Sequence, residues 1–366
     1  MTERLPPRLR ALCQRWQQAL HEATFPFEEL LERTLHYQWE HSPTLQGYWK
    51  ARGFDPHTAE DLSAVPGVPT DVFRHVTIVS NEAPTTRVFR TSGTTSGARG
   101  EHHHIDTSIY ELSARQHFQK CVLQGRRTAH FIHVAFPSST HPDSSLSHML
   151  QDFGEHLGSD ARSQDFYFDA ATGIRGPALH ARLLDAQNEG VPVILFGTAF
   201  GLADSLDALP PTALPAGSLI VQTGGFKGRR EALAPEEFYQ QLADHYGVSP
   251  GDIIAEYGMT ELSSQLWSDL SVPALDAITS ANRPLTPPPW CRVSAVDPQS
   301  LTPLPNGEPG LLRFLDLANL DSVVAIQTSD LGVVHEHGVT LLGRAPGSTP
   351  RGCSLAIEEL RNIAQR

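Results

Sequence analysis

Several short stretches of this sequence carry side chains suited to binding a nucleoside triphosphate. In residues 91–100, hydroxyl side chains and Arg99 alternate with glycines. Glycines let backbone N–H groups approach an anion closely, while hydroxyls add donors and Arg99 adds positive charge. We expect a phosphate-binding loop between a strand and a helix, although a plain flexible turn is the alternative. The hydroxyl and glycine positions that begin it are Thr91, Ser92, Gly93, Thr94, Thr95, Ser96 and Gly97.

Three further stretches could complete such a site. The ring of Tyr257 can cover a base, the hydroxyl of Thr260 can reach a phosphate, and the carboxylate of Glu261 can hold magnesium. At a predicted junction of strand and turn, Asp330 can accept both hydroxyls of a ribose, and Arg344 can bring a cation to the site. Taken singly, each has a simpler interpretation: a strand end with a helix cap, an ordinary turn, and a solvated arginine.

The elements that must position these residues follow from hydrophobic spacing and from turn signals. Apolar residues between 9 and 49 recur at helical intervals, and strands then alternate with helices. Such alternation predicts an α/β fold whose mixed, mostly parallel sheet is flanked by helices, with ligands at the carboxyl ends of strands. We predict extended segments at 72–79, 85–90, 128–136, 191–196, 218–222 and 253–256, and helices at 106–122, 178–188 and 235–246.

Changes in composition along the chain divide it into three segments. Residues 1–60 form a helical lead-in, and residues 61–284 form the α/β core. Proline and glycine crowd the start of residues 285–366, which then show short apolar runs at 310–315, 323–327 and 339–342. We predict a small β-rich subdomain there, ending in a hinge-like segment.

Composition excludes several classes of protein. Apolar residues make up 40% of the chain and charged residues 19%, as in a folded globular protein. A net charge of −13 opposes binding to nucleic acid. The 4 cysteines lie far apart, and no run of about 18 apolar residues occurs. We therefore expect a cytoplasmic protein without a membrane span, disulfide framework or nucleic-acid partner.

In this order, the four stretches resemble the boxes of the adenylate-forming superfamily, which includes acyl-CoA synthetases, peptide-synthetase adenylation domains and luciferases. A closer resemblance, over about residues 62–360, is to the LuxE-type acyl-protein synthetases of bacterial bioluminescence. The segments that carry it are 223–227, 256–263, 288–290, 316–319 and 351–355.

This resemblance implies the N-terminal domain of an adenylate-forming enzyme and a role for each box. ATP and Mg²⁺ would activate a carboxylic acid, specifically a fatty acid, to an acyl-adenylate with release of pyrophosphate. The loop would hold the β- and γ-phosphates, Tyr257 would stack on adenine and Thr260 would touch the α-phosphate. Glu261 would bind Mg²⁺. The other implied ATP or AMP contacts are Gly224, Gly225, Gly258, Asp330 at the ribose, and Arg344 at the ribose or phosphate.

Two more residues acquire implied catalytic roles. Typical members of the superfamily add a C-terminal lid domain with a catalytic lysine, which we expect to be largely missing here. Lys227 follows a Gly-Gly turn at a predicted strand end, and we expect it to replace that lysine. Cys353 matches the cysteine that carries the acyl group as a thioester in the bioluminescence synthetases. The acyl group would then pass to a partner, such as a reductase or carrier protein.

Other interpretations remain open. The chain could adenylate an aryl or other acid and pass it to CoA, an amine or a carrier protein. It could also be a non-catalytic nucleotide-binding homologue, although intact Thr, Glu, Asp and Arg in the boxes argue against this. Histidines cluster at 102–104 and 335–337, but neighbouring residues point in different directions and no third cluster has ligand spacing. We interpret both clusters as solvated loop histidines.

Overall fold

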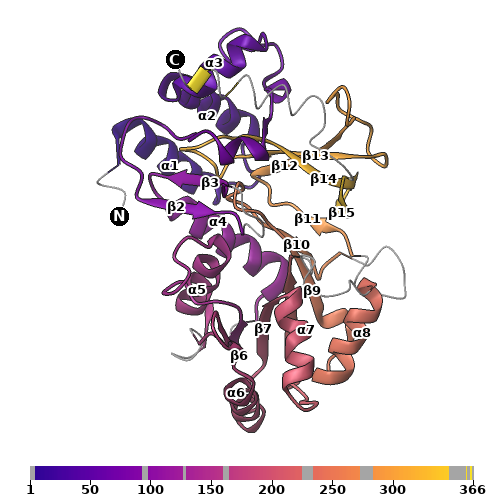
Figure 1. Ribbon diagram of the computed structural model, residues 1–366. Coiled ribbons are helices and arrows are strands. Elements are labelled where there is room, and N and C mark those ends of the chain that lie inside the picture. The colour runs from indigo at the N-terminus through magenta and orange to yellow at the C-terminus, as the bar shows by residue number, and fades with distance from the viewer. Residues whose placement is uncertain are drawn as a thin grey trace. The chain divides into compact units, whose positions relative to one another are not determined.

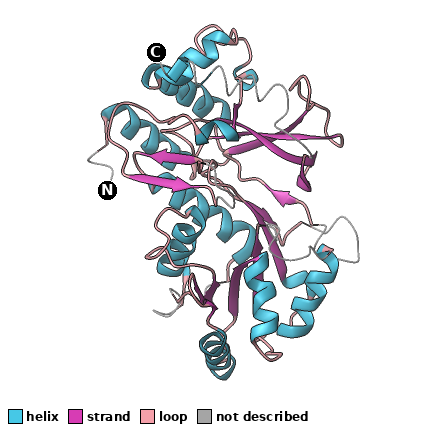
Figure 2. Ribbon diagram, in the orientation of Figure 1, coloured by secondary structure: helices cyan, strands magenta, loops and turns pink. Residues whose placement is uncertain are grey.

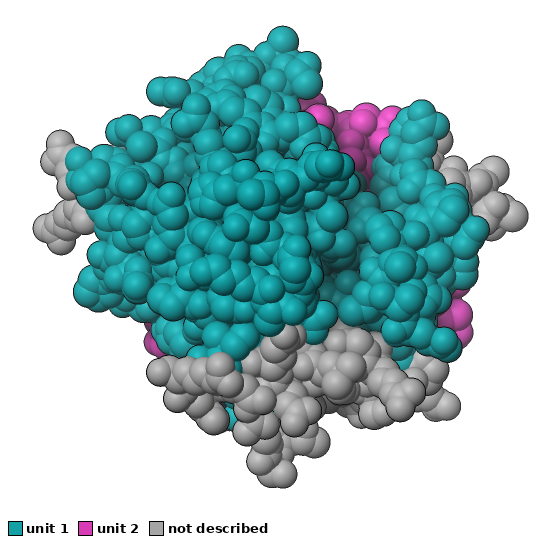
Figure 3. All heavy atoms as spheres, turned by 90° about the horizontal axis from the view of Figure 1, so that it is seen from above, with its two compact units in different colours: residues 1–113, 259–264, 287–366 teal, residues 114–258, 265–286 magenta. Residues whose placement is uncertain are grey.

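The computed structural model describes residues 5–92, 98–126, 129–159, 165–224, 234–272, 283–345, 360 and 363–364. The chain folds into two compact units (Figures 1 and 3). Unit 1 comprises residues 1–113, 259–264 and 287–366, and unit 2 comprises residues 114–258 and 265–286. The three sequence segments proposed above stay a prediction, because the units group residues in space and not along the chain.

Unit 2 contains a mostly parallel sheet. Strands β4, β7, β8 and β9 run parallel, and β10 and β11 extend the sheet with antiparallel pairing. The strands are β4 (His130–Val134), β7 (Val193–Thr198), β8 (Leu219–Thr223), β9 (Ile253–Tyr257), β10 (Leu266–Ser268) and β11 (Leu285–Thr286). A separate small hairpin pairs β5 (Phe168–Asp169) with β6 (Gly173–Ile174).

Alternate side chains of a strand point to opposite faces of the sheet. The strands of this sheet carry buried apolar residues at both sets of positions, so both faces are apolar. On one face, Ile132, Leu195 and Ile220 share a core with residues of α6, α7 and α8. Figure 2 draws the helices in cyan and the strands in magenta. On the other, Phe131 and Phe196 meet the ring of Phe118. The helical elements are α5 (Ser145–Leu157), α6 (Gly176–Glu189), α7 (Ala199–Ala208), α8 (Pro235–Tyr246), the π-helix η4 (Gln119–Leu123) and the 3-10 helix η6 (Pro250–Asp252).

Unit 1 is built on an antiparallel meander. Strands β12, β13, β14 and β15 pair in chain order, and the short β1 joins β14 in parallel. A second, two-stranded sheet pairs β2 with β3. The bounds are β1 (Val68–Pro69), β2 (Arg87–Arg90), β3 (Glu101–His104), β12 (Cys291–Val296), β13 (Pro309–Asp316), β14 (Ala325–His335) and β15 (Gly338–Arg344).

Helices of the N-terminal region complete unit 1. The buried ring of Trp16 meets Trp290 edge to face at 5.1 Å, which ties the first helix to the segment before β12. The helices are α1 (Pro7–Ala19), α2 (Phe27–His41), α3 (Pro43–Ala51), and the 3-10 helices η2 (Leu62–Ala64) and η3 (Thr70–Arg74); α4 (Ser108–Phe118) runs across the division between the units. Across the described residues, no helix has the length and apolar character needed to cross a bilayer.

Two predictions about local structure are wrong. The segment 72–79 is not extended, since η3 occupies Thr70–Arg74 and buries Val72 and Phe73 on one turn. The 91–100 loop joins two strands and does not lead into a helix, because residues 101–104 pair with β2 before α4 begins at Ser108.

Gly310 shows how closely the strands of unit 1 approach one another. A Cβ at this position would lie 2.6 Å from the carbonyl oxygen of Val296 and 3.0 Å from its amide nitrogen. We expect Gly310→Ala to lower the free energy of unfolding by about 1–3 kcal/mol, because backbone atoms must shift to admit the methyl group. Urea denaturation measures this change. Gly251→Ala is the control: its Cβ would meet only Ser249 Oγ at 3.4 Å, so a similar loss in both variants would contradict the explanation.

Candidate functional site

The base of the predicted phosphate loop is a closed hairpin end in unit 1. The amide of Gly100 donates to Oγ1 of Thr91 at 2.9 Å, and the amide of Thr91 donates to the carbonyl of Gly100 at 3.0 Å. The guanidinium of Arg99 donates to the carbonyls of Thr91 and Arg90 at 2.6 and 3.2 Å. Ser92 is exposed next to this base. The structure thus fixes both ends of the loop and presents its first residues to solvent.

Glu261 lies beside this hairpin base. A Cβ at Gly100 would come within 3.5 Å of Oε1 of Glu261 and within 3.1 Å of Cγ2 of Thr91. The absence of a side chain at Gly100 therefore lets the carboxylate approach the start of the loop. Thr260 precedes Glu261 in the same turn and is half-buried. Gly100 and Glu261 are thus neighbours in the fold although they lie 161 positions apart in the sequence.

The carboxyl group of Glu261 is buried, with 6% of the residue exposed. Burial raises its pKa to about 7, and the negative charge of Asp71 acts in the same direction. The positive charges of Arg344 and Arg74 oppose this shift. Within the described ranges, no cation lies in ion-pair contact with the carboxylate. A buried carboxyl group of this kind fits a divalent cation, which would favour its ionised form.

Asp330 and Arg344 face one another across two strands. They are directly paired in register between β14 and β15, and Nε of Arg344 donates to Oδ1 of Asp330 at 3.2 Å. The Arg344 side chain is 82% exposed, so this ion pair contributes little stability and leaves the guanidinium accessible. The predicted junction of strand and turn at Asp330 is wrong, because Asp330 lies inside β14, while Arg344 is the last residue of β15 and its side chain is solvated. Their cross-strand register brings them together.

Gly224, Tyr257 and Gly258 belong to unit 2. Gly224 follows β8 with a φ of 64°, and Tyr257 ends β9 with 9% of the residue exposed. A Cβ at Gly258 would collide with Oε1 of Glu256, so this position admits only glycine without a shift of that side chain. The Thr223 hydroxyl donates to Glu256, whose buried carboxyl has a pKa raised by desolvation to about 7. These residues cluster at the carboxyl ends of β8 and β9, as predicted for parallel strands.

The remaining predicted site residues lie outside the described residues. They are Gly93, Thr94, Thr95, Ser96, Gly97, Gly225, Lys227 and Cys353.

Sequence reasoning missed the residues that support the Thr260–Glu261 turn. His102 and His104 are buried on β3 and are not solvated loop histidines. Inward and outward positions alternate along residues 101–104 in the structure, but the sequence shows no apolar alternation there that could have indicated a strand. Asp316 and Asn319 had been noted only as part of a family resemblance, yet both are fully buried in contact with residues 261–264.

The fold and the sequence point to the same class of protein. A crystal structure of 2-hydroxyisobutyryl-CoA ligase in the postadenylation state, in complex with 2-HIB-AMP, is similar with a TM-score of 0.59 and 17% identity; the match covers 94% of this chain and 73% of that one. An open conformation of the same ligase gives a TM-score of 0.57 and 17% identity over 96% of this chain and 82% of that one. The fold is that of these adenylate-forming ligases.

Sequence comparison confirms the resemblance to the LuxE-type acyl-protein synthetases. Residues 180–361 match the model of the family described as "Acyl-protein synthetase, LuxE". The long-chain-fatty-acid–luciferin-component ligase of Vibrio harveyi is 28% identical over 153 residues, which are 38% of this chain and 36% of that protein. The ligase of the same name from Aliivibrio fischeri is 27% identical over 158 residues, 40% of this chain and 38% of that protein. The matching segment thus spans little more than a third of either relative.

The raised pKa of Glu261 has a consequence for stability. Below the unfolded-state value of 4.5 the carboxyl is protonated in both states, and between 4.5 and about 7 only the folded protein retains the proton. This group's contribution to stability is therefore lost as the pH rises through that range. We expect Glu261→Gln to match the wild type near pH 4.5 and to be more stable by about 1–3 kcal/mol at pH 8. Urea denaturation with EDTA at both values measures the difference, and equal stability at pH 8 would contradict it.

Proposed function

We propose that this chain is a ligase that uses ATP and Mg²⁺ to convert a carboxylic acid, a fatty acid, into an acyl-adenylate. The observation that carries the proposal is the buried Glu261 carboxyl beside Thr91 and Gly100 at the base of the glycine-rich loop. The match to the acyl-protein synthetases and the name of the two relatives support it. In this reaction a carboxylate oxygen attacks the α-phosphorus of ATP, the bond to the bridging oxygen breaks, and pyrophosphate leaves.

The chemical difficulty is the approach of two anions. Magnesium, when bound, neutralises phosphate charge, and Glu261 is the residue that would hold it. Thr91, Ser92 and the rest of the loop would donate to the β- and γ-phosphates, while Thr260 would donate to the α-phosphate. Asp330 would accept hydrogen bonds from the ribose hydroxyls, and its partner Arg344 would add positive charge at the ribose or phosphate.

The adenine and the reacting carboxylate require further groups. Tyr257 would stack on the base, with Gly224, Gly225 and Gly258 leaving space for the nucleotide. Lys227 would contact the acid and the phosphate, in place of the lysine that the lid domain supplies in typical members of the superfamily. In the sequence, Lys227 comes shortly after β8 ends at Thr223. The carboxyl end of β8 lies beside that of β9 in unit 2.

The second half of the proposal is capture of the acyl group by Cys353. Its thiolate would attack the acyl carbonyl, AMP would leave, and a thioester would form; a reductase or carrier protein would then accept the acyl group. The other 3 cysteines, Cys13, Cys121 and Cys291, are all buried. Burial raises the pKa of each of these thiols, which makes them poor nucleophiles. Their surroundings leave Cys353 as the candidate.

Exchange of radiolabelled pyrophosphate into ATP tests the adenylation step. We expect exchange that depends on added acid, and a panel of fatty, aryl and amino acids identifies the acid. Lys227→Met should reduce exchange to background because the positive charge between carboxylate and phosphate is lost, whereas Lys120→Met is the control that should retain it. Near-normal exchange in Lys227→Met would remove Lys227 from the mechanism. No exchange with any acid in the wild type would favour the non-catalytic homologue.

The acyl transfer step has a separate test. With ATP and the preferred acid, Cys353→Ser should still catalyse exchange but should not become acylated protein that hydroxylamine cleaves. Mass spectrometry of the intact protein measures the added acyl mass. Cys13→Ala serves as the matched control and should acquire the acyl group as the wild type does. Acylation of Cys353→Ser, or transfer to CoA or an amine without acylated protein, would contradict this step.

A further inference from the structure

The turn that bears Thr260 and Glu261 contains neither helix nor strand. Between the end of β9 at Tyr257 and the start of β10 at Leu266, residues 258–265 have no regular structure. One backbone hydrogen bond closes the turn, from the amide of Leu262 to the carbonyl of Met259 at 3.2 Å. Because the backbone itself fixes so little here, side chains from other segments must determine where the Glu261 carboxylate lies.

Asp316 holds the C-terminal side of this turn. One carboxylate oxygen accepts hydrogen bonds from the amides of Ser263 and Ser264, both at 2.9 Å. The other accepts from the hydroxyl of Ser264 at 2.6 Å and from the amide of Ala318 at 3.0 Å. The carboxylate is fully buried, and each of these four bonds is one that it accepts. Asp316 therefore binds two consecutive backbone amides two and three residues after Glu261.

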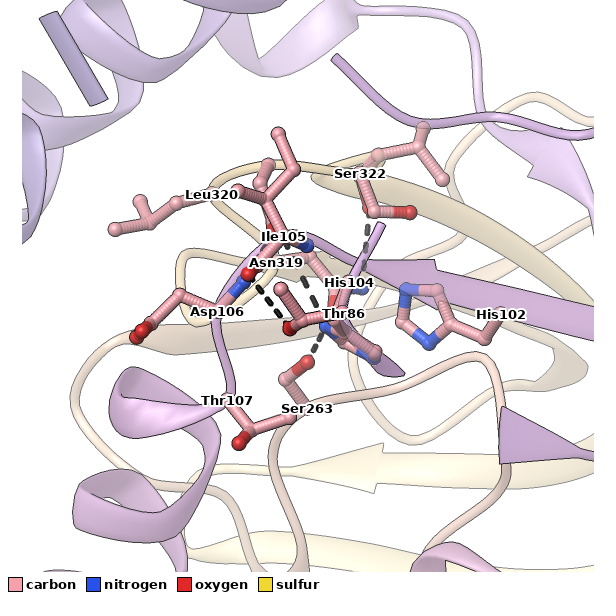
Figure 4. Close-up of polar contacts among 12 residues, drawn as sticks. Thr86, His102, His104, Ile105, Asp106, Thr107, Ser263, Asn319, Leu320 and Ser322 are labelled. Carbon is pink, nitrogen blue, oxygen red and sulfur yellow. Dashed lines mark hydrogen bonds and ion pairs between the residues drawn. The ribbon is translucent and has the colours of Figure 1, made fainter. Parts of the chain in front are cut away.

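Asn319 and His102 hold the carbonyls of the two site residues. The amide nitrogen of Asn319 donates to the carbonyl of Glu261 at 3.0 Å, and its oxygen accepts from the hydroxyl of Ser263 (Figure 4). The Nδ1 atom of His102 lies 2.8 Å from the carbonyl of Thr260. Since a carbonyl can only accept, Nδ1 carries the proton. Asn319 and His102 are both fully buried.

Within the described part of the chain, the polar contacts of His102 involve only one of its two ring nitrogens. Its Nε2 is buried and has no hydrogen-bond partner among the described residues. Leaving a buried acceptor unpaired costs free energy. Burial also holds the pKa of His102 well below its usual range, so the ring is neutral. Among the residues that the structure describes, the ring thus makes one hydrogen bond, and that bond is to Thr260.

We propose that His102, Asn319 and Asp316 are positioning residues that hold the Thr260–Ser264 turn so that the Glu261 carboxylate faces the loop base at Thr91 and Gly100. The inference deepens the proposed function, because it rests on Glu261 as the magnesium ligand. Each of the three side chains binds the backbone of the turn and not the Glu261 carboxylate itself. Their loss should therefore weaken the binding of magnesium with ATP more than it weakens folding.

Two substitutions at position 102 separate positioning from packing. In His102→Asn the side-chain amide nitrogen takes the place of Nδ1 and can still donate to Thr260, whereas His102→Gln places its amide near Nε2. We expect His102→Gln to need about tenfold more Mg²⁺ for half-maximal pyrophosphate exchange, as substitutions around a metal ligand commonly do. His102→Asn should need a Mg²⁺ concentration close to that of the wild type.

A measurement without catalysis accompanies this test. Mg²⁺ with ATP should raise the melting temperature of the wild type and of His102→Asn, and should raise that of His102→Gln by much less at the same concentrations. His104→Asn is the matched control for packing. His104 is the next buried histidine on β3, its ring packs against that of His102 with centroids 4.1 Å apart, and its Nδ1 lies 3.7 Å from Oδ1 of Asp321 instead of at a carbonyl of the turn. The His104→Asn variant should melt at a lower temperature and keep the wild-type Mg²⁺ requirement.

Each outcome decides the proposal. A wild-type Mg²⁺ requirement in His102→Gln would overturn it, as would an equal change in His104→Asn. If the wild type shows no exchange but Mg²⁺ with ATP still raises its melting temperature, the proposed reaction fails while the melting shifts still test the positioning role. If Mg²⁺ with ATP does not raise the melting temperature of the wild type, both proposals fall.

Discussion

Burial of the Glu261 carboxyl on an irregular turn is the constraint on which the rest of unit 1 depends. A carboxylate removed from water loses solvation, and here burial raises its pKa to about 7. The turn is held in this position by three side chains from other segments, His102, Asp316 and Asn319, all of which are fully buried. Without a bound cation this carboxyl group lowers stability as the pH rises toward that pKa, and binding of a divalent cation would favour its ionised form.

The architecture of unit 1 brings together the segments that hold the turn bearing Glu261. Strand β13 of the antiparallel meander ends at Asp316. The residues that follow place Asn319 within hydrogen-bond distance of the turn that bears Glu261. The hairpin of β2 and β3 supplies the buried His102 and, at the base of its loop, Gly100. The same meander pairs Asp330 with Arg344 in register. Segments far apart in sequence thus meet where the proposed reaction needs carboxylate, hydroxyl and guanidinium groups.

Local patterns predicted strands β4, β7, β8 and β9 and helices α6 and α8 of unit 2, but they missed helices α5 and α7. Helix α8 occupies Pro235–Tyr246, as predicted from Pro235 and Gly247. Local patterns did not predict β3, because its three consecutive histidines show no apolar alternation in the sequence. In the structure these residues alternate between half-buried and buried positions. The contacts of Asp316 could not be predicted, because its partners lie 52 and 53 positions earlier and no periodicity links them. The family resemblance indicated Glu261 and Asp330, but cross-strand register determines how Asp330 is paired.

Two buried carboxyl groups, Glu256 and Glu261, have the same raised pKa of about 7, so pKa alone does not select the metal ligand. Their surroundings differ. Oε2 of Glu256 accepts a hydrogen bond from the Thr223 hydroxyl, and its Oε1 lies close to the backbone of Gly258. Glu261 lies beside the base of a glycine-rich loop, with the charges of Arg74 and Arg344 acting on it. Of the two, Glu261 is therefore the carboxylate that we propose would hold a magnesium ion, and Glu256 has the surroundings of a structural residue that stabilises the end of β9.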